Sequence, residues 1–152
     1  MLAATIGRRI DKTGQMDIRR LVEGDEDRVV AASHLFDNSA DSDATRRFLA
    51  DGRHHIFVAY EGEHPVGFVT GVEVTHPDKG TEMFLYELAV QEEYRRRGIG
   101  RELVESLKVL AQERGCYGMW VLTDAENIAA RSTYERSGGI AETGQVVVVW
   151  QF

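Results

Sequence analysis

Cysteine and proline are nearly absent from this sequence, which has one Cys and two Pro in 152 residues. Cys116 has no second cysteine for an internal disulfide, and no clustered histidines accompany it, so the sequence predicts neither a disulfide nor a metal site. Glycines are spread along the chain without a low-complexity run, which gives no sign of a linker. We expect one domain, and the single cysteine suits a reducing cytoplasm.

Long apolar runs are also missing. The longest ones, such as 146–150, have the length of a strand, whereas a membrane-spanning helix needs roughly 20 apolar residues. The first fifteen residues lack the apolar core and cleavage-site pattern of a secretory signal. We interpret residues 1–15 as an arm or upstream extension and residues 16–152 as the domain, with no membrane partner.

Positive charge is scarce as well, since 18 Lys and Arg face 25 Asp and Glu, for a formal net charge of -7. Nucleic-acid binding requires basic residues clustered over a wide surface, so this balance argues against a nucleic-acid partner. The exception is local. The stretch "YRRRGIGREL", residues 94–103, gathers arginines and glycines directly before an apolar helical pattern.

The order of apolar patterns predicts a mixed α/β domain rather than a uniform Rossmann alternation. Strand patterns fall near 16–21 and over 81–90 and 117–124, and "HIFVAYEGEHPVGFVTGVEV" reads as a β-hairpin. Helical patterns follow the first strand and recur over 41–52, 99–115 and 128–134. The last eight residues, "QVVVVWQF", are predicted to close the chain as a strand.

The stretch 94–103 is predicted to bind an anion. Backbone N–H groups at a helix N-terminus have no intrahelical acceptor, and the helix dipole adds partial positive charge there. Gly98 and Gly100 would let a ligand approach the backbone closely. A P-loop is disfavoured because no Gly-Lys-Ser/Thr follows. A phosphate-bearing cofactor and a solvated turn both stay open from the residues alone.

The segment "ELAVQEEYRRRGIGRELV" resembles the signature of the GNAT N-acetyltransferase superfamily, whose pyrophosphate loop runs Arg/Gln-x-x-Gly-x-Gly/Ala. Further along, "NIAARSTYERSGG" carries Asn127, Ala130 and Tyr134 at the family's spacing. The resemblance covers residues 16–152. It implies an α/β (α+β) fold with a mixed, largely antiparallel central sheet flanked by helices, in which two strands splay apart around acetyl-coenzyme A.

The resemblance also implies a set of residues for binding acetyl-coenzyme A. Backbone groups of one strand would pair with the pantetheine arm, amides of the loop would hold the pyrophosphate, and the later motif would add contacts. The strand residues are Leu88, Ala89 and Val90; the loop residues are Arg95, Arg96, Arg97, Gly98, Ile99, Gly100 and Arg101; and the motif residues are Asn127, Ala130 and Tyr134. Asn127 is equally a candidate to cap its helix.

Two side chains are candidates for the chemistry. Strand alternation is expected to place Met83, Leu85, Glu87 and Ala89 on one face. Desolvation there would raise the proton affinity of the Glu87 carboxylate toward that of a useful base; a strand-edge glutamate in solvent is the alternative. Tyr134 is the family's usual general acid and is otherwise a half-buried core tyrosine.

Acidic residues near such a site would favour a polycationic amine. The candidates for substrate binding are Asp41, Asp43, Glu73, Glu87, Asp124 and Glu126, and Asp37, Glu82 and Glu142 extend the same acidic set; generic acidic surface is the alternative. "LFDNSADSDATRRFLADGRHHIFVA" and "MFLYELAVQEEYRRRGIGRELV" resemble the small aminoglycoside 3-N-acetyltransferases of the GNAT type. This sequence departs from them in carrying Glu87 where aspartate is expected.

Three functions therefore stay open. The first is transfer of acetyl from acetyl-coenzyme A to a polycationic small molecule, an aminoglycoside at its 3-amino group. The second is acetylation of a peptide N-terminus, a lysine or a polyamine. The third is a module that binds acyl-coenzyme A without turnover, which the pairing of Glu87 with Tyr134 argues against. A homodimer, with the closing strand paired across its interface, is an open partner prediction.

Overall fold

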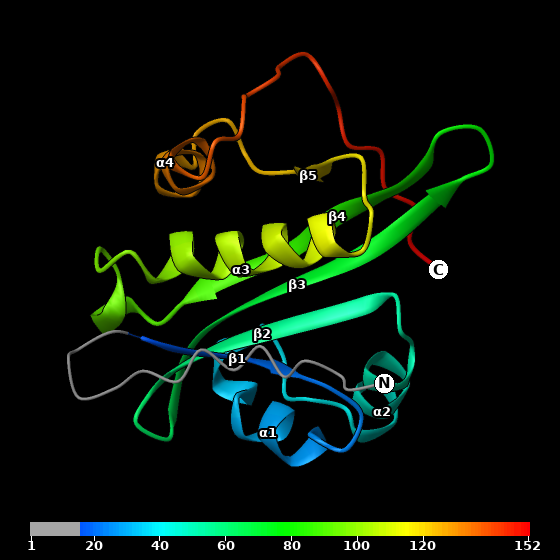
Figure 1. Cartoon of the computed structure of the whole chain (residues 1–152). Helices are drawn as coiled ribbons and strands as arrows, with labels where there is room; N and C mark the ends of the chain where they lie inside the picture. The colour runs from blue at the N-terminus through cyan, green and yellow to red at the C-terminus, as the bar shows by residue number, and fades with distance from the viewer. Residues whose placement is uncertain (1–15) are drawn as a thin grey trace.

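The computed structural model describes residues 16–152 and contains a five-stranded sheet covered by helices on both faces (Figure 1). The strands are β1 (Asp17–Leu21), β2 (His54–Glu61), β3 (His64–His76), β4 (Gly80–Val90) and β5 (Met119–Val121), and the helices are α1 (Glu26–Ala31), α2 (Ser42–Ala50), α3 (Ile99–Glu113) and α4 (Ile128–Arg136), with 3-10 turns η1 (Ser33–Leu35) and η2 (Glu92–Tyr94). The predicted arm, 1–15, lies outside the described residues. Within 16–152 no helix is long and apolar enough to cross a membrane.

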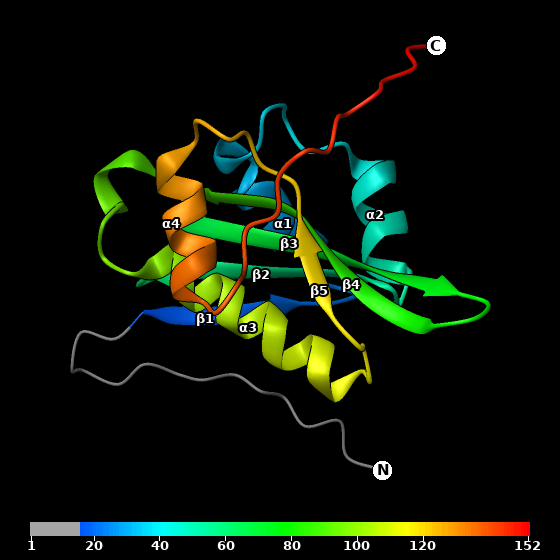
Figure 2. The ribbon, with the colours of Figure 1, turned by 90° about the horizontal axis from the view of Figure 1, so that it is seen from above.

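The sheet has the order β1-β2-β3-β4-β5. The first four strands pair antiparallel, and β5 pairs parallel with β4. Helices α1 and α2 lie on one face, whereas α3 and α4 lie on the other (Figures 1 and 2). The predicted fold, a mixed and largely antiparallel sheet flanked by helices, is confirmed, as is the β2–β3 hairpin.

Helix α3 packs one apolar stripe on the sheet. This stripe is buried and forms a core cluster with Met83 and Leu85 of β4. Gly71 of β3 permits the close approach, because a Cβ there would lie 2.7 Å from Leu107 Cδ1. Helix α3 ends as predicted, with Gly115 in the left-handed region at a φ of 75°.

A β-bulge interrupts β4 and corrects the predicted strand alternation. Thr70 of β3 pairs with Glu87, but its neighbour Gly71 pairs with Leu85, so Tyr86 is an extra residue on β4. Met83 and Leu85 pack toward α3, while Glu87 faces the α1 and α2 side. The predicted common face is therefore wrong, because the bulge reverses the alternation between Leu85 and Glu87.

The predicted closing strand 145–152 is wrong too. The segment has no strand pairing, and the apolar side chains of 146–150 are exposed, from 64% for Val148 to 84% for Val146. Figure 2 shows the last residues extending beyond the folded body. Residues 146–150 have the composition of a strand, but a strand forms only where a neighbouring strand accepts its hydrogen bonds.

Candidate active site

A cavity of about 610 Å³ opens on the α1 and α2 side of the sheet. Its floor comes from β2, β3 and β4, including Ile56, Thr70 and Glu87, and its wall from the segment between η1 and α2. Two carboxylates line it, Glu87 and Asp37, and its lining within the described chain contains no Lys, Arg or His. The cavity therefore suits a cation.

Glu87 is held in this cavity by the bulge. Its backbone N–H donates to the hydroxyl of Thr70, with 3.2 Å between N and Oγ1, and Thr70 is itself buried. Burial raises the pKa of the Glu87 carboxyl, and the nearby negative charge of Asp37 raises it further. A carboxylate whose proton affinity is raised in this way is suited to accept a proton from an ammonium group.

Tyr134 lies on the opposite face of the sheet from Glu87. It packs against the α3 core cluster and lines a second cavity of about 300 Å³ with Leu85 and Cys116. Burial raises the pKa of the Tyr134 phenol, so its hydroxyl keeps its proton at neutral pH. The two predicted catalytic residues therefore line two different cavities.

Strands β4 and β5 part between these two cavities. Their pairing begins at Met83 and ends at Leu85 and Val121, although β4 continues to Val90. From Tyr86 onward, the β5-side edge of β4 has no strand partner within the described chain. Leu88, Ala89 and Val90, the predicted pantetheine contacts, lie on this stretch, and so the structure brings them beside the opening between the strands.

The loop after β4 has the backbone geometry of an anion site. Arg96 and Gly98 both lie in the left-handed region, with φ values of 62° and 81°, and Gly98 caps α3. Alternating handedness turns successive N–H groups toward one side. Among the described residues, no acceptor pairs with the amides from Arg96 to Arg101. Together with the α3 dipole, these groups fit a pyrophosphate.

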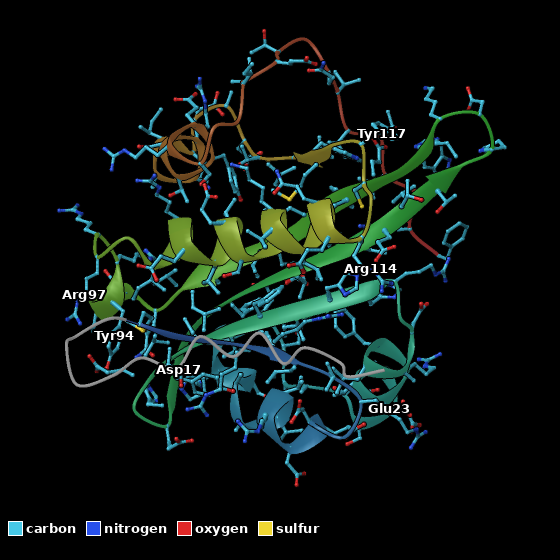
Figure 3. The ribbon with its side chains drawn as sticks, viewed as in Figure 1. Asp17, Glu23, Tyr94, Arg97, Arg114 and Tyr117 are labelled. Atoms are coloured by element: carbon cyan, nitrogen blue, oxygen red, sulfur yellow. The ribbon has the colours of Figure 1, made fainter. Side chains whose placement is uncertain are left out.

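The three arginines of the loop have different surroundings. Arg95 donates from Nε to the Val90 carbonyl at 3.0 Å, which fixes the end of β4. The Arg97 guanidinium lies over the ring of Tyr94, 4.9 Å from its centroid. Figure 3 labels both side chains at this end of the molecule. Arg97 also pairs with Glu61 at 3.5 Å. Arg96 has no ion pair with any described residue, so its guanidinium can meet a ligand.

The later motif borders the start of α3. The Asn127 side chain accepts a hydrogen bond from the Ala130 amide at 3.1 Å, so its oxygen caps α4, one of the two roles left open. A Cβ on Gly100 would lie 3.4 Å from Thr133 Cγ2, and α4 therefore flanks the loop. Asp124 and Glu126 are exposed in the connection from β5 to α4 and line neither cavity.

Three other predicted substrate residues are not brought to the cavity. Asp41 caps α2 by accepting from the Ala44 amide at 2.7 Å. Asp43 pairs on the surface with Arg46 at 2.7 Å. Glu73 belongs to a separate polar cluster. Acidic side chains at the start of a helix accept hydrogen bonds from backbone N–H groups that have no intrahelical acceptor. Acidic residues at a helix start therefore do not by themselves indicate a binding site.

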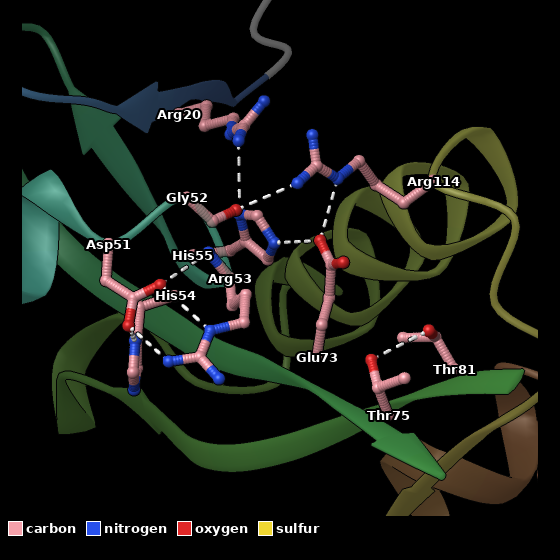
Figure 4. Close-up of polar contacts among 10 residues, drawn as sticks. All are labelled: Arg20, Asp51, Gly52, Arg53, His54, His55, Glu73, Thr75, Thr81 and Arg114. Carbon is pink, nitrogen blue, oxygen red and sulfur yellow. Dashed lines mark hydrogen bonds and ion pairs between the residues drawn. The ribbon is translucent and has the colours of Figure 1, made fainter. Parts of the chain in front are cut away.

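The carboxylate of Glu73, near the C-terminal end of β3, contacts two side chains (Figure 4). Its Oε1 lies 2.7 Å from Arg114 Nε and 2.8 Å from His55 Nε2. The other ring nitrogen of His55 lies 3.1 Å from Arg20, which can only donate. His55 is therefore neutral, with its proton on Nε2 toward Glu73, and burial lowers its pKa.

Thr70 and Tyr86 are site residues that the sequence analysis missed. A buried threonine in a strand has no local signature, and the extra residue of the bulge, Tyr86, is neither Gly nor Pro. Asp37 had been named only as part of the wider acidic set. Its place in the cavity depends on the course of the chain after η1, which no local pattern specifies.

A largely antiparallel sheet whose fourth strand parts from a parallel neighbour, beside a glycine loop that starts a helix, defines the GNAT class of folds. The chain belongs to the acetyltransferase (GNAT) family, which matches residues 21–139. The resemblance seen in the loop motif thus extends over most of the chain.

Two curated relatives illustrate the range of the family. The chain is 31% identical to N-acetyltransferase 8B of Rattus norvegicus over 105 residues, which are 68% of this chain and 47% of that protein. It is 39% identical over 57 residues to the [ribosomal protein bS18]-alanine N-acetyltransferase of Escherichia coli (strain K12), 38% of each chain. The chain spans about half the length, or less, of these relatives.

Solved structures share the fold at low sequence identity. An aminoglycoside acetyltransferase from an uncultured soil metagenomic sample, meta-AAC0020 in complex with sisomicin, has a TM-score of 0.82 at 23% identity, covering 90% of this chain and 96% of that one. AAC(6')-Iy with a bisubstrate analogue, CoA-S-monomethyl-acetylneamine, has a TM-score of 0.75 at 20% identity, covering 91% and 99%. These likenesses establish the fold.

Proposed function

We propose that residues 16–152 form a cytoplasmic N-acetyltransferase domain that transfers acetyl from acetyl-coenzyme A to a primary amine of a polycationic small molecule, an aminoglycoside at its 3-amino group. The observation that carries this proposal is Glu87, a carboxylate of raised pKa in an acidic cavity beside the opening between β4 and β5. The sequence resemblance to the small aminoglycoside 3-N-acetyltransferases supports the substrate class.

The roles proposed for the chain's own residues follow from where they lie. Acetyl-coenzyme A, when bound, supplies an acetyl thioester. Amides of residues 96–101 would hold its pyrophosphate, and the edge of β4 at 88–90 would align its pantetheine arm. Glu87 accepts the proton that the amine loses as its nitrogen bonds to the acetyl carbon. Tyr134, across the sheet, donates a proton to the thiolate that departs as the C–S bond breaks.

A peptide N-terminus is the second candidate substrate, and one observation favours it. The ribosomal-protein alanine acetyltransferase of Escherichia coli is named for a protein substrate, and it is 39% identical to this chain over 57 residues. A protein α-amine is also cationic near neutral pH, so the acidic cavity suits it as well. Lysine side chains and polyamines share that charge. Charge alone does not separate these substrates.

A thiol-release assay with acetyl-coenzyme A across a panel of amines tests these alternatives. The panel contains sisomicin, spermidine, an alanine-started peptide and lysine. We expect the highest kcat/KM with sisomicin, and mass and NMR analysis of its product identifies the acetylated nitrogen. A higher kcat/KM with the peptide would replace the aminoglycoside assignment. Binding of acetyl-coenzyme A with no thiol release from any amine would support the non-catalytic module.

We also propose that the chain forms a homodimer through residues 145–152. Five consecutive apolar residues, 146–150, are exposed to water, and such a stretch favours pairing with another strand. Light scattering on the protein and on a Val148→Asp variant tests this. We expect a dimer that becomes a monomer in the variant, and a wild-type monomer would refute the proposal.

A further inference from the structure

An aromatic surface adjoins the proposed amine site on the same side of the sheet. The rings of Phe84 and Trp120 are stacked, with 4.2 Å between their centroids and an interplanar angle of 23°. Tyr86 meets Phe84 edge to face at 5.6 Å. Tyr86 and Trp120 are 66% and 40% exposed. We call these three side chains, Tyr86, Phe84 and Trp120, the aromatic platform.

The platform is continuous with the cavity. Tyr86 lines the cavity beside Glu87, and the bulge turns both residues to that side of the sheet. Phe84 lies three residues before Glu87 on the same strand, and Trp120 is its partner on β5. Because the bulge places Phe84 and Glu87 opposite Val72 and Thr70, which are two residues apart on β3, the platform begins about 7 Å along the sheet from Glu87 at about 3.3 Å per residue. This distance matches a second ring attached to the ring that carries the reacting amine.

Charge and shape define what fits this combination. Glu87 and Asp37 attract a cation, while aromatic faces attract both the apolar C–H faces of a saturated ring and the ammonium groups on its edge. A linear polyamine satisfies the carboxylates but has no ring to lie on the platform. A compact amine would leave the platform in water. The two surfaces together require a ligand that is both polycationic and built from linked rings.

We propose that the aromatic platform binds a second ring of a polycationic, multi-ring amine whose reacting nitrogen lies at Glu87. This inference rests on the proposed acetylation of such an amine in the cavity, and it adds residues that select ring-bearing substrates over linear ones. Tyr86 connects the two surfaces, since its ring belongs to the platform and lines the cavity.

The test uses the protein's own fluorescence without acetyl-coenzyme A. The sequence has two tryptophans, so Trp150→Phe leaves Trp120 as the single reporter. In this background we expect sisomicin to change the Trp120 emission with saturation, and spermidine to leave the emission unchanged. Phe84→Leu and Tyr86→Leu remove a ring but keep apolar bulk, and each should raise the sisomicin Kd at least about tenfold. Tyr86→Phe, the matched control, should keep it within about twofold.

Calorimetry with spermidine separates a lost ring contact from a damaged cavity. Phe84→Leu should leave spermidine binding unchanged, and the melting temperature reports whether each variant is folded. Sisomicin Kd values unchanged in both leucine variants would overturn the proposal. So would a variant that alters the oligomeric state instead of the Kd, because the platform would then be covered by a second copy. If sisomicin changes the Trp120 emission but is not acetylated in the thiol-release assay, the proposed transfer reaction is refuted and the proposed platform is retained.

Discussion

The backbone N–H of Glu87 donates to the Thr70 hydroxyl, 3.2 Å from N to Oγ1, at the bulge where β4 has one residue more than β3. A regular strand would point Glu87 into the core that Met83 and Leu85 form with α3. The bulge places the carboxylate in the cavity with Asp37 instead. The orientation of the proposed base thus depends on this one irregularity and on the threonine that bonds to it.

Thr70→Val tests this dependence. Valine keeps the shape of threonine but cannot accept the Glu87 amide, and an unsatisfied buried amide costs about 1–3 kcal/mol. We expect a lower melting temperature and a kcat reduced by roughly tenfold, since the carboxylate is no longer held in place. Thr75→Val, at the exposed Thr75–Thr81 hydroxyl pair on the same strand, is the matched control. Equal effects of the two substitutions would contradict the role of Thr70.

Glu87→Gln tests the base itself. Glutamine keeps the size of the side chain and removes its capacity to accept a proton. We expect kcat to fall about 100-fold or more, with the affinity for acetyl-coenzyme A nearly unchanged, in the thiol-release assay. Asp124→Asn removes an exposed carboxylate that lines neither cavity and should retain activity. A rise in KM at constant kcat in Glu87→Gln would show that Glu87 only attracts the cation.

The pH dependence of kcat should report the raised pKa of Glu87. A base acts in its deprotonated form, so kcat increases with pH through the pKa of this carboxyl, which burial and Asp37 place above the usual value of about 4.5. The residual activity of Glu87→Gln should lack this rise. Measurement of kcat from pH 5 to 8 in the wild type and in Glu87→Gln tests this prediction. If kcat rises with pH in the same way in both proteins, the rise is due to the titration of another group.

The sequence predicted the elements whose signals are local. Helix α3 has an apolar stripe, a glycine-containing start and a glycine end, and each of these acts within a few residues. The cap of α2 at Asp41 is equally local. These same features set the backbone of the loop from Arg95 to Arg101, whereas anion binding there stays a prediction.

Features that depend on distant partners could not be predicted. The bulge at Tyr86 arises from pairing with β3, and strict alternation therefore misplaced Glu87. The closing segment 145–152 has high strand propensity but no neighbouring strand in the described chain. Asp37 lines the cavity, whereas Asp41 caps α2. The local sequence does not distinguish these two roles, which depend on the path of the chain.

Gly98→Val tests the loop. Gly98 has a φ of 81°, which valine adopts only with strain, so the amides that follow should be displaced. Acetyl-coenzyme A at 100 times its Kd should stabilise the wild type by about 2.7 kcal/mol, and we expect the variant to lose this shift in melting temperature. Gly24→Val introduces similar strain before α1, at a φ of 99°, and should keep the full shift. A full shift in Gly98→Val would refute the pyrophosphate assignment.

The neutral state of His55 predicts how stability changes with pH. Its Nδ1 accepts from Arg20 and its Nε2 donates to Glu73, which also binds Arg114, and burial lowers the pKa of His55 in the folded protein. The unfolded chain takes up a proton near pH 6.5, so the stability from His55 is present above that pH and is lost as the pH falls toward the folded pKa. Glu73, whose pKa is lowered below about 4.5, contributes to the pH dependence only at lower pH.

His55→Gln isolates this effect, because a glutamine amide can accept from Arg20 and donate to Glu73 but does not titrate. Between pH 7 and 5 we expect the melting temperature of the wild type to fall more steeply than that of the variant, since the other histidines are common to both. Calorimetry at matched ionic strength measures the two curves. Parallel curves would show that His55 binds its proton equally in the folded and unfolded chains, contrary to the neutral histidine that Arg20 requires.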